Sequence, residues 1–209
     1  MSIKKKLKDY LFLKRCIGCE TKAVLDDYGF CDNCFQHLIF IENPAQSEIH
    51  HIFRYEGCIK NIISEFKYGK KRFYGKKMAK MVAAYLKQNR VGDFDFIIPV
   101  PLHWTKEFMR GFNQSAIVSV YLGRLLYKKT LLNVLLKARS TKSQTLIEGK
   151  ERKLNVKNSF KVKNSHLIKK RKILLLDDVY TTGATAYEAK KQLLSAGAQK
   201  VIILTVAKA

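Results

Sequence analysis

One stretch decides the fold of this chain of 209 residues: Ile173-Leu174-Leu175-Leu176-Asp177-Asp178-Val179-Tyr180-Thr181-Thr182-Gly183-Ala184-Thr185. The four apolar residues at its start are typical of a buried strand, and two carboxylates follow where we expect that strand to end. A turn of small and hydroxyl-bearing residues then leads into a helix, which we expect from about Ala184 to Ala196, where Gly197 stops it. Strand, polar turn and helix in this order form the repeating unit of α/β proteins.

The turn in this stretch has the chemistry of a phosphate site. Backbone amides and the hydroxyls of Thr181, Thr182 and Thr185 can surround one phosphate, and the helix amino terminus adds partial positive charge. Asp177 and Asp178 are poor phosphate partners, but they are good acceptors for ribose hydroxyls or ligands for hydrated magnesium. The alternative is an ordinary strand end with threonine helix caps, although paired aspartates are more than capping requires. We therefore predict a site for a sugar phosphate.

The pattern around this stretch alternates strands and helices. Such alternation predicts a mostly parallel sheet with helices on both faces, and ligands of these sheets bind at the carboxyl ends of the strands. At the start of the first strand, we expect His50 and His51 to be a solvated pair, with a role as ligands as the alternative. We expect strands over 52–55, 94–100, 159–162, 173–176 and 201–206, an apolar run over 133–137, and helices over 59–66, 74–86, 113–127 and 184–196.

Four of the five cysteines form two CxxC pairs, with eleven residues between the pairs. Two such turns supply the four thiolates that tetrahedral zinc prefers, and four cysteine ligands leave no open position on the metal. We therefore expect a structural zinc. Two disulfides or unrelated thiols are the alternative, and they fit poorly with a cytoplasmic location. The candidate ligands are Cys16, Cys19, Cys31 and Cys34.

The chain is expected to divide into a small module and a medium-sized domain. Its amino-terminal part offers few apolar side chains, and a segment that small rarely stays folded without a staple such as a metal. Pro44 and the polar residues around it are typical of a linker. We predict a zinc-binding module over 1–45 and an α/β domain over 46–209.

The charge of the chain is unevenly distributed. Its 40 Lys and Arg stand against 17 Asp and Glu, a formal net charge of +23. Residues 60–90 contain ten basic residues and one acid, and residues 137–172 contain thirteen basic residues and two acids. Such a field attracts polyanions, although it says nothing about the fold. The hydrophobic content of 47% is enough for a real core and excludes disorder as the global state.

The start of the chain bears on its location. The sequence contains no run of about eighteen apolar residues of the kind that spans a membrane. Residues 2–15 are basic like the start of a signal peptide, but the apolar segment that a signal peptide needs is missing. We therefore expect a cytoplasmic protein. The short apolar side of residues 2–15 would allow peripheral contact with an anionic membrane at most.

Cations alternate with aromatic residues in the stretch that begins at Lys67. Cations follow phosphates and aromatic faces stack on unpaired bases, so the combination suits single-stranded nucleic acid. The alternative is that the aromatic residues are core and the lysines are solvated. The candidate nucleic-acid residues are Lys67, Tyr68, Lys70, Lys71 and Arg72.

Further segments narrow the family. Two prolines stiffen the segment Pro99–Leu102, and Lys106 and Arg110 bring cations to the sheet edge before a helix that Asn113 can cap. Together with Phe66–Gly69, the four cysteines and the strand-turn-helix stretch, this arrangement resembles the ComF family of competence proteins. That family is a type I phosphoribosyltransferase-like group linked to DNA uptake in natural transformation.

The resemblance implies a type I phosphoribosyltransferase-like fold and roles for individual residues. The turn, with Thr181, Thr182, Gly183, Ala184 and Thr185, would bind the 5-phosphate of phosphoribosyl pyrophosphate, and Asp177 and Asp178 the ribose hydroxyls. Lys106 and Arg110 would stabilise the pyrophosphate, with magnesium bridging its oxygens to the ribose. A mobile loop over 139–155 would cover the site.

The resemblance also implies a role in the cell. The protein would bind incoming single-stranded DNA on the cytoplasmic side, near the inner face of the cytoplasmic membrane, together with other DNA-uptake proteins. The alternative is an active phosphoribosyltransferase with an unknown acceptor, in which Asp177, Asp178 and Arg110 are catalytic. A sugar phosphate that regulates DNA binding would join the two.

Overall fold

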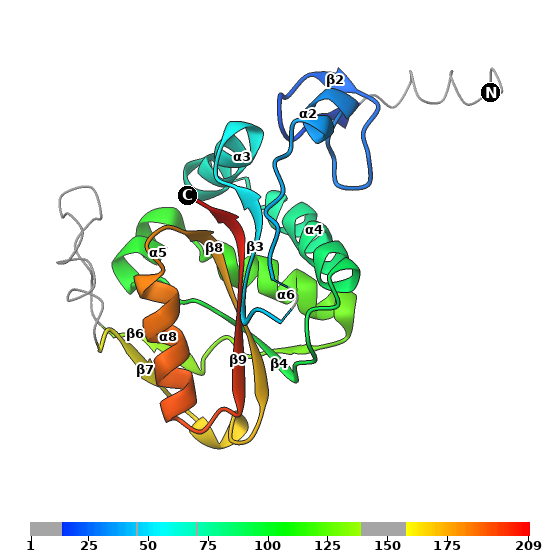
Figure 1. Ribbon diagram of the computed structural model, residues 1–209. Coiled ribbons are helices and arrows are strands. Elements are labelled where there is room, and N and C mark those ends of the chain that lie inside the picture. The colour runs from blue at the N-terminus through cyan, green and yellow to red at the C-terminus, as the bar shows by residue number, and fades with distance from the viewer. Residues whose placement is uncertain (1–13, 45, 70, 139–157) are drawn as a thin grey trace.

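The computed structural model describes residues 14–44, 46–69, 71–138 and 158–209 (Figure 1). Lys70, the expected covering loop over 139–155 and the basic start up to residue 13 lie outside the described residues. Within the described ranges, no helix combines the length and apolar character that a membrane crossing requires.

The strands are β1 (Lys14–Arg15), β2 (Lys22–Ala23), β3 (Ile49–Arg54), β4 (Phe96–Pro99), β5 (Lys129–Thr130), β6 (Leu135–Lys137), β7 (Phe160–Val162), β8 (Lys172–Tyr180) and β9 (Lys200–Lys208). The helices are α2 (Asp32–Gln36), α3 (Gly57–Tyr68), α4 (Tyr74–Gln88), α5 (Trp104–Arg110), α6 (Gln114–Leu126) and α8 (Ala184–Ser195), with a 3₁₀ turn at Ser165–Leu167.

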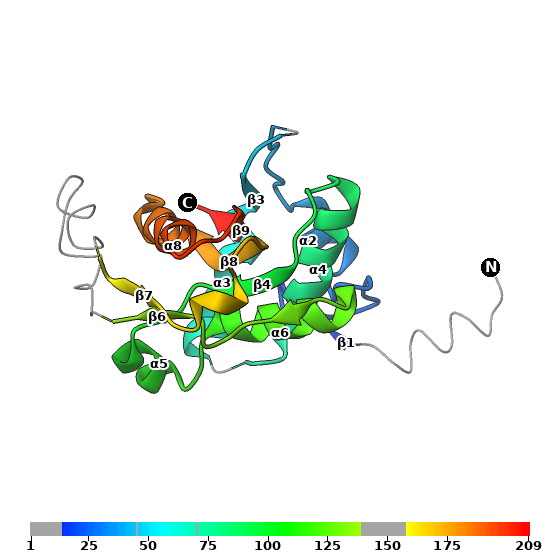
Figure 2. The same cartoon turned by 90° about the horizontal axis from the view of Figure 1, so that it is seen from below.

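A five-stranded sheet forms the centre of the molecule. Its strand order is β3-β9-β8-β4-β5, and every neighbouring pair in it is parallel. Helices α6 and α8 lie on opposite sides of this sheet, as the view in Figure 2 shows. The predicted mostly parallel sheet with helices on both faces is confirmed.

The two faces of the sheet can be followed along β8. Leu174 and Leu176 belong to the buried cluster that contains the apolar faces of α3, α4 and α6, whereas Ile173 and Leu175 belong to the cluster that contains α8. All four side chains are fully buried. Successive residues of a strand point to opposite faces, so a continuous apolar run is the pattern of a strand covered on both sides. Burying each such side chain contributes about 1.5–3 kcal/mol.

Strand β8 is longer than its apolar run predicts. It continues through Asp177 and Asp178 to Tyr180, because β9 pairs with it as far as the Tyr180 and Lys208 pair. Strand β4 ends earlier, at Pro99, which lies opposite Leu176. Beyond Leu176, β8 therefore pairs only with β9 among the described strands. The two carboxylates lie inside the strand and not after it, at a point where one edge of the strand faces a cleft.

The amino-terminal part of the chain packs on the sheet domain. Strands β1 and β2 pair antiparallel, α2 follows, and Ile17 and Phe30 join the same buried cluster as α3 and α4. The chain then runs beside β3, where the Ile41 amide donates to the Ile52 carbonyl at 3.0 Å. The division into 1–45 and 46–209 stays a prediction.

Two further features differ from the sequence-based expectations. The segment after Pro101 contains the short helix α5, which we did not predict. The expectation that His50 and His51 are solvated is wrong, since both are buried in β3. Their Nδ1 atoms lie 3.1 Å from the Tyr85 hydroxyl and 2.8 Å from the Thr205 hydroxyl, respectively. The packing of α4 and β9 against β3 covers both imidazoles.

Candidate functional site

A cavity of about 220 Å³ lies at the carboxyl end of β4. The elements that line it are far apart in the sequence, namely the ends of α3 and β4, helix α5, the end of β6, the second half of β8 and the turn that leads into α8. The carboxyl ends of parallel strands are where ligands of such sheets bind. We call this hollow the β8 cavity. The predicted site residues that line it are Lys67, Lys106, Arg110, Asp177, Asp178, Thr181, Gly183 and Thr185.

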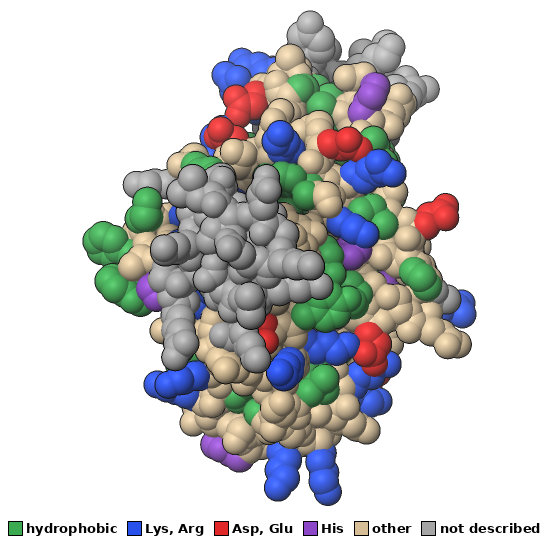
Figure 3. All heavy atoms as spheres, turned by 60° about the vertical axis from the view of Figure 1, so that its left-hand side comes forward, with side chains coloured by type: hydrophobic (Ala, Val, Ile, Leu, Met, Phe, Trp, Pro, Cys, Tyr) green, Lys and Arg blue, Asp and Glu red, His purple; other side chains and the backbone are tan. Residues whose placement is uncertain are grey.

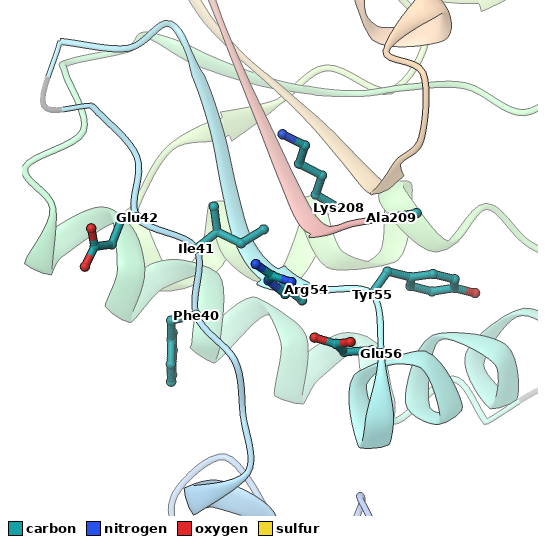
Figure 4. Close-up of a pocket in the computed structure, with 8 residues that line it drawn as sticks. All are labelled: Phe40, Ile41, Glu42, Arg54, Tyr55, Glu56, Lys208 and Ala209. Atoms are coloured by element: carbon teal, nitrogen blue, oxygen red, sulfur yellow. The ribbon is translucent and has the colours of Figure 1, made fainter. Parts of the chain in front are cut away.

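A larger cavity of about 390 Å³ lies between residues 40–42, the end of β3 and the end of β9. Figure 4 shows the residues that line it. Its charged side chains, Glu42, Arg54, Glu56 and Lys208, are of both signs and come from separate segments. It contains none of the site residues predicted from the sequence. The chemistry of the chain points to the smaller β8 cavity.

The acidic side of the β8 cavity is anchored by hydrogen bonds. The Ser115 hydroxyl of α6 donates to Asp177 Oδ1 at 3.1 Å, and the Asp178 amide donates to the same oxygen at 2.9 Å. Asp178 Oδ1 accepts from the Val179 amide at 2.6 Å. Lys67 Nζ lies 2.9 Å from Asp178 Oδ2, and both side chains are only 15% exposed. The carboxylates are thus held in place, with Lys67 as their internal counter-ion.

The environment of the cavity shifts the pKa values of Asp177 and Lys67. Burial, and after it the charge of Asp178, raise the pKa of Asp177 to about 7, against the opposing effect of Lys67 and Ser115. Burial alone would lower the pKa of Lys67, but the nearby Asp178 outweighs it, so that pKa lies above its ordinary value. Near neutral pH, Lys67 stays charged while Asp177 can gain or lose a proton.

Three cations line the cavity besides Lys67. They are Lys106 and Arg110 of α5 and Lys137 of β6. Burial, and next the charge of Arg110, lower the pKa of Lys106. Burial, and next the charge of Lys106, lower the pKa of Lys137. Since a bound anion would stabilise all three charges, this cluster favours an anionic ligand.

Lys137 was not among the residues predicted from the sequence. It lies 27 residues beyond Arg110 in the sequence, in a short strand with no recognisable motif. The only signal was the basic zone that begins with it. Only the fold brings it to the cavity.

The turn before α8 completes the cavity. Thr181, Gly183 and Thr185 line it, and Thr182 and Ala184 are not among the lining residues. Gly183 has a φ of +77°, and a Cβ there would collide with the Tyr180 ring, so this position requires glycine. No side chain caps the amino terminus of α8. Its first amides are therefore not used by a side-chain cap and can face a ligand.

The residues predicted to bind nucleic acid do not share one environment. Lys67 lies in the β8 cavity, whereas Tyr68 is 69% exposed, with the Arg110 guanidinium 5.3 Å from its ring centre. Lys71 forms ion pairs with Glu65 and Glu20. Arg72 is exposed, and its guanidinium lies 4.8 Å from the ring centre of Phe112. Lys70 lies outside the described residues.

The four cysteines lie together. One ligand atom from each of Cys16, Cys19, Cys31 and Cys34 lies within 4.8 Å of the others. The amides of Gly18 and Cys31 each donate to Cys16 Sγ at 3.3 Å, and such bonds orient a thiolate ligand. A Cβ at Gly18 would approach Cys34 Sγ to 2.9 Å, so the backbone there wraps closely around the sulfurs. The cysteines are positioned to bind a metal, and four thiolates complete a tetrahedral, structural site.

Comparison with curated proteins identifies relatives of the chain. Competence protein F of Haemophilus influenzae is 26% identical over 208 residues, which cover 93% of this chain and 90% of that protein. Competence protein ComFC of Streptococcus pneumoniae is 31% identical over 150 residues, which cover 72% of this chain and 63% of that protein. The chain is homologous to the ComF competence proteins. The DNA utilization protein YhgH of Escherichia coli is 35% identical over 107 residues, about half of this chain and 46% of that protein. No protein-family model matches the chain.

Solved structures similar to this ComF homologue carry phosphoribosyltransferase names. Adenine phosphoribosyltransferase of Leishmania tarentolae has a TM-score of 0.44 at 9% identity, with 69% of this chain and 74% of that chain covered. Glutamine phosphoribosylpyrophosphate amidotransferase of Bacillus subtilis has a TM-score of 0.43 at 20% identity, with 63% of this chain and 25% of that chain covered. At TM-scores of this size the overlap says nothing about the site.

Proposed function

We propose that this ComF homologue acts in DNA uptake, binding phosphoribosyl pyrophosphate with magnesium in the β8 cavity and single-stranded DNA on the basic surface beside it. One observation carries the first part of the proposal. The cavity is lined by charges of both signs, since Asp177 and Asp178 line it together with Lys106, Arg110 and Lys137. A ligand that combines hydroxyls with a polyphosphate suits both kinds of group.

Each part of the cavity would hold one part of that ligand. The turn from Thr181 to Thr185 and the uncapped start of α8 would hold the 5-phosphate. Asp177 and Asp178 would accept hydrogen bonds from the ribose hydroxyls. The cations of α5 and β6 would hold the pyrophosphate, where bound magnesium would neutralise further phosphate charge.

The remaining parts of the proposal concern the metal and the location. We propose that zinc occupies the four-cysteine site, because four thiolates suit it better than they suit magnesium or calcium. We also propose that the protein works on the cytoplasmic side of the membrane, since reduced cysteines suit that compartment.

The DNA part of the proposal rests on charge and on the names of the relatives. If about six phosphates are neutralised, the affinity for a short single-stranded oligonucleotide falls by orders of magnitude between about 50 and 200 mM salt. Fluorescence anisotropy of a labelled oligonucleotide measures this. Binding that stays unchanged over the salt range would refute the mechanism.

A second candidate function is phosphoribosyl transfer to an unknown acceptor. The pKa of Asp177, raised to about 7, favours it, because a proton acceptor works best with a pKa near the operating pH. The two functions differ in one experiment. Transfer predicts pyrophosphate release that Asp177→Ala abolishes, whereas DNA binding predicts oligonucleotide affinity that survives the same change.

A further inference from the structure

A surface groove of about 720 Å³ lies beside the β8 cavity and shares no lining residue with it. Helix α5 separates the two, since Lys106 and Arg110 face the cavity while Glu107 lines the groove. The groove runs along the outer side of α6, and we call it the α6 groove. The lining residues that matter below are Arg72, Phe73, Phe112, Tyr121 and Arg124.

The groove combines aromatic rings with cations. The Arg72 guanidinium lies 4.8 Å from the ring centre of Phe112, and the Arg124 guanidinium lies 5.7 Å from the ring centre of Tyr121. Both arginines are exposed, Tyr121 is half-buried and Phe73 is 56% exposed. Among the lining residues, Glu107 is the one acid. Figure 3 shows one face of the molecule, on which Lys and Arg side chains lie among apolar ones.

The packing of two helices fixes Phe73 at the groove. A Cβ at Gly75 would collide with the Ile117 side chain, so the start of α4 lies very close to α6. Phe73 precedes α4 directly, and its ring contacts that of Tyr74, which is buried. Phe73 therefore presents an exposed ring at the groove, beside the ring of Tyr121 among the lining residues, where a planar ligand could stack on it.

We propose that the α6 groove binds unpaired bases of single-stranded nucleic acid, with Phe73 and Tyr121 stacking on bases and Arg72 and Arg124 contacting phosphates. This inference rests on the proposed DNA binding and adds the place where the bases lie. Charge complementarity supports this occupant, because the two exposed arginines belong to a chain with a net charge of +23. Stacking rings interleaved with cations are the usual platform for single strands.

The groove also continues the basic stretch that the sequence singled out. Lys71 is held by Glu65 and Glu20, so its charge is already partly neutralised. Arg72 lacks such an ion pair among the described residues and faces the groove. A single strand of nucleic acid that contacts Arg72 would therefore contact Phe73 next.

The test compares two oligonucleotides of equal length, one of thymidines and one of abasic sites, so that both carry the same number of phosphates. Fluorescence anisotropy gives their affinities for the full chain and for Phe73→Ala, Tyr121→Leu, Tyr121→Phe and Arg124→Gln. Tyr127→Ala is the matched control, since Tyr127 is 97% exposed and is not among the groove residues. Thermal melting checks that each variant folds, and Phe73, being exposed, can be truncated safely.

We expect Phe73→Ala and Tyr121→Leu to weaken thymidine binding by about 5- to 150-fold and to leave abasic binding unchanged, because only bases stack. Tyr121→Phe and Tyr127→Ala keep full affinity, and Arg124→Gln weakens both oligonucleotides with a smaller salt dependence.

If the aromatic variants lose equal affinity for both oligonucleotides, or if they fold and lose no affinity, the α6 groove does not bind the bases and the inference is wrong. The proposed DNA binding would still stand. No binding by the unaltered chain would overturn the proposed function as well. If sedimentation shows instead that Phe73→Ala converts a dimer to a monomer while DNA affinity is unchanged, a second copy of the chain occupies the groove and the inference is wrong.

Discussion

The pH dependence of sugar-phosphate binding should follow the ionisation of Asp177. Burial and Asp178 raise its pKa to about 7. Ribose hydroxyls and magnesium bind the ionised carboxylate, which makes up about one tenth of the group at pH 6 and about nine tenths at pH 8. The affinity for phosphoribosyl pyrophosphate should therefore rise about tenfold from pH 6 to pH 8 on account of this group alone.

The fluorescence of Trp104, the single tryptophan of the chain, provides the assay. Its ring lies 5.7 Å from that of His103, which lines the β8 cavity. Titrations with phosphoribosyl pyrophosphate at constant magnesium, from pH 6 to pH 8.5, give the affinity at each pH.

Two variants assign the effect to Asp177. Asp177→Asn removes the ionisable carboxyl and leaves the ionisation of the ligand unchanged, so the difference in pH dependence between this variant and the unaltered chain belongs to Asp177. Lys67→Met removes a cation that lowers the pKa of Asp177, and it should move the transition to higher pH. The reasoning is refuted if the affinity of the unaltered chain changes with pH no more than that of Asp177→Asn.

Three further predictions concern the turn, a buried histidine and the metal. Gly183→Ala should lower the free energy of unfolding by about 1–2 kcal/mol and also weaken ligand binding. Gly197→Ala, at a φ of +98° and far from the cavity, should lower only the free energy of unfolding. Calorimetry that finds the same ligand affinity for both variants would contradict this. Burial, and next Lys208, lower the pKa of His51 to about 4, so the free energy of unfolding should fall by about 2.5 kcal/mol as the pH drops from 7 to 4.5. In urea denaturation, the free energy of unfolding of His51→Gln should change much less over this pH range. An equally large decrease in His51→Gln would contradict the prediction. Chelation should speed amide hydrogen exchange over residues 16–34, and freshly purified protein should contain one zinc per chain; metal analysis that finds none would exclude the zinc site.

Local patterns were sufficient to predict most of the central elements. The apolar run Ile173–Leu176 predicts a strand covered on both faces, because no other environment buries four consecutive side chains of a strand. The spacing of the cysteines predicts their cluster, because each CxxC turn points both sulfurs at one centre. The paired aspartates and the hydroxyl-rich turn predict one wall of the cavity, because they are contiguous in the sequence.

Long-range packing produced the features that the sequence did not predict. Lys137 reaches the cavity through β6, and Lys67 turns inward to Asp178 although its neighbours in the sequence suggest a solvated cation. His50 and His51 are buried because α4 and β9 pack against their strand. No local periodicity carries this information, since each position depends on a partner more than 30 residues away.

The central claim is that the β8 cavity binds phosphoribosyl pyrophosphate with magnesium. Calorimetric titration of the unaltered chain, with and without magnesium and with and without a single-stranded oligonucleotide, tests it most directly. The proposal predicts one magnesium-dependent binding event per chain, which Asp177→Asn weakens. Absence of binding under all four conditions would contradict the claim.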